Sequence, residues 1–178
     1  MKTLRLHLRP YGVSDVPACL ALWQEPDVVR FIGGRALTPE DVWARLYRHT
    51  GHHGIHGFGF GAVMEGERYG GEAGFAFNQR GLGERFDGAP EVGWALNAGS
   101  RGRGLGRELV EGLCAEADGR WQAGDDRFSR LVCLIEPTNA PSLHLAVRAG
   151  FVPFGEASYK GAQVQLFERT AGAASPPI

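Results

Sequence analysis

Hydrophobic and polar positions in the first third of the chain switch between strand spacing and helix spacing. Leucines alternate with polar residues over residues 4–9 and predict a strand that ends before Pro10. Apolar positions three and four residues apart predict a helix over residues 14–25. The Thr38-Pro39 pair, a capping residue followed by proline, predicts the start of a second helix. Residues 27–37 are left as an apolar connector.

The middle of the chain has the alternation of a hairpin. Residues 58–64 and 71–77 each carry apolar side chains at every second position, and a Glu-Gly-Glu-Arg turn separates them. This pattern predicts two antiparallel strands. Residues 78–90 are rich in glycine and charge, and they predict a long loop.

The second half alternates strand and helix. Residues 91–96 predict a strand, and leucines every four residues predict an amphipathic helix over 105–119. The uninterrupted apolar run 131–135 is typical of a strand buried on both faces and paired in parallel. A helix capped by an asparagine follows over 139–150, and residues 163–166 predict a last strand.

This order of elements predicts an α/β fold with a central mixed antiparallel and parallel sheet and helices on both faces. A chain of 178 residues is long enough to bury a core and suits one domain, which we place at residues 1–169. The Ala/Gly/Ser/Pro composition of residues 170–178 predicts a disordered tail.

Composition narrows the function classes. The chain has 43% hydrophobic and 22% charged residues and a formal net charge of −1, which argues against disorder and against a general affinity for nucleic acid. Cys19, Cys114 and Cys133 lie in apolar contexts and are expected to be reduced core residues. No signal peptide or membrane span is visible, so we expect a cytoplasmic protein without a membrane partner.

Four histidines crowd residues 49–56 and raise the question of a metal site. No Cys, Asp or Glu ligand lies close by, and glycines interrupt the run. A solvated loop is therefore the favoured interpretation, and no metal is expected.

The segment Arg101-Gly102-Arg103-Gly104-Leu105-Gly106 lies between a predicted strand and a predicted helix. Glycines let the backbone approach a ligand, and the first N–H groups of a helix lack intrahelical partners and lie at the positive end of its dipole. A phosphate or pyrophosphate fits such a place. Arg107 replaces the third glycine of the dinucleotide fingerprint, and the Gly-Lys-Ser/Thr of a P-loop is absent from the sequence.

The pattern Arg101-x-x-Gly104-x-Gly106 directly after a strand resembles the Arg/Gln-x-x-Gly-x-Gly/Ala signature of the GNAT N-acetyltransferases. Residues 25–32 and Asn139-Ala-Pro-Ser142 are similar to the branch that acetylates ribosomal-protein N-termini, the RimJ/RimL type. The resemblance covers residues 3–169. It implies a GNAT fold and an enzyme that moves acetyl from acetyl-coenzyme A directly to a primary amine in a ternary complex.

The resemblance also implies where the coenzyme is held. Its pyrophosphate is expected on the N–H groups of the glycine segment, and its pantetheine arm beside the end of the strand 91–96. Arg101 and Arg103 either form a solvated basic face or, as we favour, meet the phosphates. The expected coenzyme-binding residues are Leu96, Asn97, Arg101, Gly102, Arg103, Gly104, Leu105, Gly106, Asn139 and Ser142.

Amine acetylation needs a base for the amine, donors for the oxyanion and an acid for the thiolate. Glu91 is the candidate base, because family members often place a carboxylate on this strand and its strand face is otherwise Gly93 and Ala95; the alternative is a glutamate in water. Backbone N–H groups near Leu96 and Asn97 are candidates for the oxyanion.

Many GNAT enzymes use a tyrosine as the acid, where this chain has Ala146. The candidate acid is therefore Ser142, by resemblance to the RimJ/RimL branch; the alternative is a serine that satisfies helix N–H groups. Tyr159, His144 and water are further candidates. Cys133, mid-run in a buried strand, is expected to be core and not a nucleophile.

Several questions stay open at this level. A non-catalytic acyl-coenzyme A sensing module is the alternative function, supported by the missing tyrosine. The amine acceptor is a protein N-terminus or a small molecule such as an antibiotic, polyamine or amino acid. The apolar residues 28–32 line either the acceptor pocket or the interface of a homodimer.

Overall fold

A computed structural model describes residues 1–173, and residues 174–178 of the predicted tail lie outside the described residues. Hydrogen bonds order the seven strands as β1-β2-β3-β4-β5-β7-β6. Antiparallel pairs and the parallel pair of β4 with β5 occur in this sheet. The predicted α/β fold with a mixed sheet is confirmed.

The chain divides into two compact units, which we describe separately. Unit 1 comprises Met1–Ala76 and Gly93–Leu109, and unit 2 comprises Phe77–Val92 and Val110–Ile178. The prediction of one domain over residues 1–169 stays a prediction. Residues directly after 169 have a defined structure, although the sequence placed them in the tail. Strand β7 ends at Thr170, and the N–H of Gly172 donates to Asp118 at 3.0 Å.

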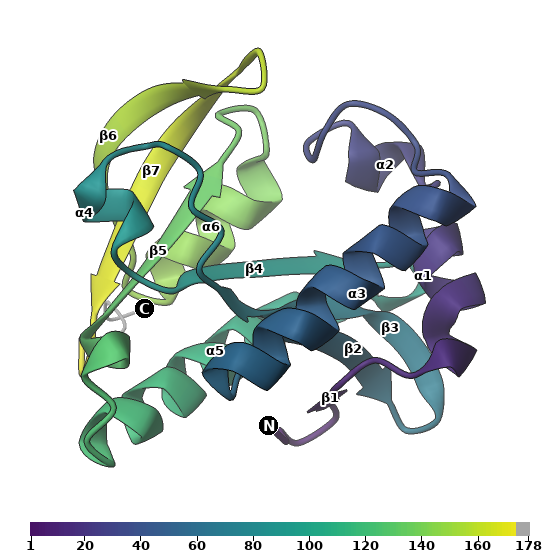
Figure 1. The fold of residues 1–178 in the computed structure, drawn as a ribbon, viewed down its shortest axis with the longest axis horizontal. Helices are drawn as coiled ribbons and strands as arrows, with labels where there is room; N and C mark the ends of the chain where they lie inside the picture. The colour runs from purple at the N-terminus through teal and green to yellow at the C-terminus, as the bar shows by residue number, and fades with distance from the viewer. Residues whose placement is uncertain (174–178) are drawn as a thin grey trace. The chain divides into compact units, whose positions relative to one another are not determined.

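Unit 1 contains the first three strands and three helices, and the end of β4 and the start of α5 (Figure 1). In chain order its elements are β1 (His7–Arg9), the 3-10 turn η1 (Val13–Asp15), α1 (Val16–Leu22), α2 (Pro26–Val29), α3 (Pro39–His56), β2 (Phe60–Glu65), β3 (Arg68–Ala76), β4 (Glu91–Leu96), the 3-10 turn η2 (Ala98–Ser100) and α5 (Leu105–Gln122).

Local sequence signals set several of these boundaries. The hydroxyl of Thr38 accepts from the N–H of Asp41 at 3.2 Å, so the predicted cap of α3 is confirmed. The hairpin of β2 and β3 is confirmed as antiparallel. Helices α1 and α3 contact each other, and they pack on β3 and β2 respectively (Figure 1).

Three predictions about unit 1 need correction. The N-terminal strand begins only at His7, because residues 3–6 form a turn closed by the N–H of Thr3 and the carbonyl of Leu6 at 2.9 Å. The helix predicted over 14–25 is shorter and splits into η1 and α1. The connector 27–37 contains most of α2, and Val28 and Val29 pack into the unit 1 core, which leaves neither of them exposed for a dimer interface.

Unit 2 contains the start of β4, most of α5, and α4 (Glu84–Asp87), the 3-10 turn η3 (Asp126–Ser129), β5 (Arg130–Ile135), α6 (Ala140–Arg148), β6 (Val152–Tyr159) and β7 (Ala162–Thr170). The strand predicted at residues 131–135 is β5, and the parallel pairing predicted for it is found with β4, where Glu91 aligns with Val132. Its other neighbour, β7, is antiparallel. Strand β7 lies beside β5, and β6 lies on the other side of β7 (Figure 1).

The predicted loop 78–90 is an ordered segment. Phe86 of α4 is 2% exposed and packs with Val132, Val164 and Leu166. The carboxylate of Asp87 accepts from the N–H groups of Arg80 at 2.6 Å and Leu82 at 2.8 Å. Burial of the Phe86 ring and hydrogen bonds to the Asp87 carboxylate therefore hold residues 78–90 in place. The composition of this segment predicted only a loop. Strand β6 was also missed, because its residues lack a clear alternation.

Candidate functional site

The glycine segment 101–106 lies in unit 1 between β4 and α5, as predicted, and its last two residues are the first two of α5. Gly102 and Gly104 have φ angles of 72° and 77°, a region that residues with a Cβ seldom adopt. Within residues 1–173, the N–H groups of residues 102–106 donate no hydrogen bond of normal geometry. Five successive backbone donors at a helix N-terminus fit the phosphates of a coenzyme.

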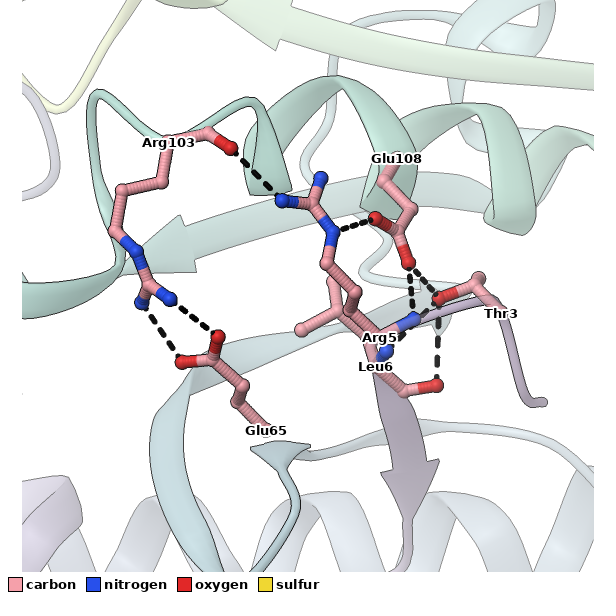
Figure 2. A network of polar contacts seen from close by, with 6 residues as sticks. All are labelled: Thr3, Arg5, Leu6, Glu65, Arg103 and Glu108. Carbon is pink, nitrogen blue, oxygen red and sulfur yellow. Dashed lines mark hydrogen bonds and ion pairs between the residues drawn. The ribbon is translucent and has the colours of Figure 1, made fainter.

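The arginine side chains of this segment are engaged elsewhere in unit 1. Arg101 pairs with Glu25, and its second nitrogen lies 3.5 Å from Asp27. Arg103 donates to both oxygens of Glu65, at 2.6 and 2.8 Å (Figure 2). The role of Arg101 and Arg103 at the phosphates stays a prediction, and in this structure carboxylates already balance both charges.

The end of β4 is held closely against β3. A Cβ on Gly71 would lie 2.1 Å from the carbonyl oxygen of Ala95, so only glycine permits this approach. The N–H of Asn97 donates to the carbonyl of Gly70 at 2.9 Å. This N–H is therefore in use, and the suggestion that it serves the oxyanion does not fit the structure. Leu96 is buried, with 9% of its surface exposed.

In unit 2, Glu91 is buried and ion-paired. It is 6% exposed, and its two oxygens accept from Nε and Nη2 of Arg80 at 2.5 and 2.6 Å. The alternative of a glutamate in water is therefore wrong. The guanidinium of Arg80 also lies over the ring of Tyr159, 4.8 Å from its centroid. Burial lowers the pKa of Arg80, but the hydrogen bond and charge of Glu91, together with Tyr159, outweigh burial and raise it.

Helix α6 places the remaining predicted residues. The side-chain oxygen of Asn139 accepts from the N–H of Ser142 at 3.3 Å, so its capping role is confirmed. Ser142 is half-buried in the first turn, whereas His144 is exposed. The roles of Asn139 and Ser142 toward a coenzyme stay predictions.

Two functional candidates escaped the sequence analysis. Arg80 lies in the segment expected to be a loop, where no periodic pattern indicates which side chain turns inward. Glu72 is the buried polar centre of unit 1, with 1% of its surface exposed. Glu72 is the single charged residue within the predicted strand 71–77, and this was the available signal, since a buried charge requires a partner.

Glu72 gathers donors from three segments of unit 1. Arg45 of α3 donates to one oxygen through two nitrogens, and Tyr11 and Trp23 donate to the other at 2.7 and 3.1 Å. The thiol of Cys19 lies 3.8 Å from that second oxygen. Burial raises the pKa of Glu72, but the charge and hydrogen bonds of Arg45, together with His49 and Tyr11, outweigh burial and lower it to about 2.

The histidines of residues 49–56 belong to the last turns of α3 and not to a loop, which corrects the prediction. His49 is 2% exposed and stacks on Phe60 with ring centroids 4.8 Å apart. Burial lowers its pKa to about 3. Among residues 1–173, no group of three or more His, Cys, Asp or Glu side chains could hold a metal ion.

The cysteines behave as predicted. All three are free and buried. Burial raises the pKa of Cys19 to about 12 and that of Cys114 to about 11, and it also raises the pKa of Cys133. These thiols are therefore poor nucleophiles at neutral pH. In the described part of the chain, no helix combines the length and apolarity that crossing a membrane requires.

The chain is similar to several solved structures. A protein described as a GNAT-family acetyltransferase from Bordetella pertussis is 35% identical over 96% of this chain and 98% of its own, with a TM-score of 0.82. An acetyltransferase from Agrobacterium tumefaciens str. C58 is 25% identical over 94% and 92%, with a TM-score of 0.73.

A third structure, RimL, a ribosomal L7/L12 alpha-N-protein acetyltransferase in complex with coenzyme A, is 18% identical over 97% of both chains. Its TM-score of 0.76 shows a shared fold alone. No curated protein sequence matches the chain. The family described as "Acetyltransferase (GNAT) domain" matches residues 5–152, and the chain therefore belongs to the GNAT acetyltransferases.

Proposed function

We propose that this protein is an acetyl-coenzyme A-dependent N-acetyltransferase that transfers acetyl directly to a primary amine, within the RimJ/RimL-like branch. The observation that carries the proposal is the run of N–H groups of residues 102–106, which donate no hydrogen bond within residues 1–173 and lead into the first residues of α5. Membership of the GNAT family supplies the reaction class.

In this proposal, unit 1 binds the coenzyme. The N–H groups of residues 102–106 would hold the pyrophosphate, and the left-handed Gly102 and Gly104 keep those donors free of side-chain bulk. Acetyl-coenzyme A supplies an activated thioester when bound. Arg101 and Arg103 would meet phosphates only by leaving the carboxylates with which they pair.

Glu91 of unit 2 is assigned the base. A carboxylate offers about four lone-pair positions, and Arg80 occupies one on each oxygen. One position on each oxygen is left to accept a proton from an amine, directly or through a water. A protein α-amine has a reference pKa of about 8 and a lysine amine about 10.4, so a weak base suffices for an α-amine.

Ser142 is assigned the acid. Its N–H donates to the side-chain oxygen of Asn139, which caps the first turn of α6, where the serine lies. The serine hydroxyl would give a proton to the departing thiolate. Many GNAT enzymes use a tyrosine for this step, but this chain has Ala146 at that position, and alanine has no proton to give. The buried thiols, with their raised pKa values, support direct transfer without an acetylated cysteine.

The experiment is a screen of N-terminal peptides and small amines with acetyl-coenzyme A, read by release of coenzyme A. Turnover with an amine and intersecting initial-velocity lines would support the proposal. Parallel lines or an isolable acetylated protein would contradict direct transfer. Coenzyme binding by calorimetry without turnover over the whole panel would favour a sensing module instead.

Preference for peptides over polyamines, aminoglycosides and amino acids would support the RimJ/RimL-like assignment. Preference for a small amine would support acetyltransferase activity but contradict the RimJ/RimL-like assignment.

A further inference from the structure

We infer that Thr3 and Arg5, in the segment before β1, are positioning residues that orient the backbone of the coenzyme segment 101–106. This inference rests on the proposed function, because it gives these residues a part in binding the same coenzyme. All of the contacts involved lie within unit 1 (Figure 2).

The first contact fixes the N-terminal segment on α5. Glu108, in the first turn of α5, accepts hydrogen bonds from the hydroxyl of Thr3 at 2.5 Å and from the N–H and Nε of Arg5 at 2.6 and 2.7 Å. The hydroxyl of Thr3 accepts in turn from the N–H of Leu6 at 3.0 Å. Residues 3–6 are thereby tied to the helix turn that follows the coenzyme segment.

The second contact acts on the segment itself. Nη1 of Arg5 donates to the carbonyl oxygen of Arg103 at 3.0 Å (Figure 2). The carbonyl of Arg103 and the N–H of Gly104 belong to one trans peptide, in which the two groups point in opposite directions. Arg5 therefore directs the N–H of Gly104 away from itself, as one of the free donors.

Charge alone does not account for this arrangement. The guanidinium of Arg5 is balanced by Glu108, and that of Arg103 is balanced by Glu65. What Arg5 adds is a fixed direction for a peptide next to a left-handed glycine, which would otherwise sample many conformations. Donors held in place before binding lose less entropy when the ligand binds.

The test is calorimetry of coenzyme A binding to the full chain carrying Arg5→Gln. We expect the dissociation constant to rise about tenfold, since charged hydrogen bonds are involved. At saturating coenzyme the turnover number should stay within about twofold of wild type, because Arg5 touches no reacting group. Arg35→Gln, which removes the same charge from an exposed pair with Asp41, is the matched control and should change neither quantity.

Glu108→Gln separates orientation from charge. Loss of a negative charge near a polyanion tightens binding if charge alone matters. The substitution also replaces one carboxylate oxygen, which accepts from Arg5 or Thr3, by an NH2 donor. If orientation matters this weakens binding, and we expect weakening of about fivefold. Thr3→Ser should keep wild-type affinity because it keeps the hydroxyl, whereas Thr3→Val should not.

Unchanged coenzyme affinity in Arg5→Gln, or tighter binding by Glu108→Gln, would overturn this inference while leaving the proposed function intact. A lower melting temperature of either variant without weaker binding would also overturn it, by showing a purely structural role. A wild-type protein that binds no coenzyme A would overturn the proposed function itself.

Discussion

Each unit contains a buried strand glutamate paired with an arginine, but the two carboxylates differ in how many donors they accept. Within the described chain, Glu72 accepts two hydrogen bonds from Arg45 and one each from Tyr11, Trp23 and Cys19. Among residues 1–173, Glu91 accepts only the two hydrogen bonds from Arg80.

This difference separates a structural carboxylate from one that can still react. The donors of Glu72 use the whole lone-pair capacity of a carboxylate, and its pKa of about 2 keeps it ionised. Glu91 keeps acceptor capacity, although the side chains of the two arginine partners are almost equally exposed, at 18% for Arg45 and 21% for Arg80. Burial and ion pairing alone therefore do not identify a catalytic glutamate, and the remaining acceptor capacity is the more useful criterion.

The largest expected effect is on stability, from Glu72→Gln. Removing the charge leaves Arg45 buried without its counter-ion, which should lower the free energy of unfolding by about 3 kcal/mol or more. Urea unfolding followed by circular dichroism measures this. Glu67→Gln, at an exposed turn position, should change it by less than about 0.5 kcal/mol. Equal effects of the two variants would contradict a structural role for Glu72.

The pH dependence of stability should also show that the fold depends on the ionised carboxylate of Glu72. The pKa of Glu72 is lowered from 4.5 to about 2, so its contribution to stability is complete above pH 4.5 and is lost as pH falls toward 2. The loss is on the order of 3 kcal/mol. The stability difference between wild type and Glu72→Gln should therefore narrow over this window, as measured by urea unfolding at each pH. A constant difference would refute the lowered pKa.

Glu91→Gln should lower both turnover and stability. We expect the turnover number to fall about a hundredfold, as for loss of a general base. Arg80 loses the counter-ion of a buried pair, so the free energy of unfolding should fall by about 3 kcal/mol. Steady-state rates across pH, together with melting temperatures, measure both. Glu156→Gln on exposed β6 serves as the control. An unchanged rate and pH profile would remove Glu91 from the mechanism and make it structural, like Glu72.

The smallest expected effect belongs to Ser142→Ala. Loss of the hydroxyl should lower the turnover number at saturating coenzyme about tenfold and leave stability nearly unchanged, because Asn139 accepts from the backbone N–H. Release of coenzyme A gives the rate. Full activity of this variant would point to Tyr159 or water as the acid.

Much of the fold was predictable because it follows from local chemistry. The Thr38-Pro39 start, the β2–β3 hairpin, the strand β4 and the Asn139 cap each follow from residues close together in the chain. The segment before α5 is of the same kind, since its glycines and its place between strand and helix are visible in the sequence.

Tertiary structure decided the partners of the charged side chains. Arg80 and Glu91 are 11 residues apart, and Thr3 and Glu108 are 105 residues apart, so no local spacing relates them. Tertiary contacts also hold residues 78–90 in place through burial of Phe86, and they pair Arg103 with Glu65. The sequence by itself determined where an anion-binding backbone and a strand carboxylate occur. Only packing decided which carboxylates keep free lone pairs, because that depends on donors brought from distant parts of the chain.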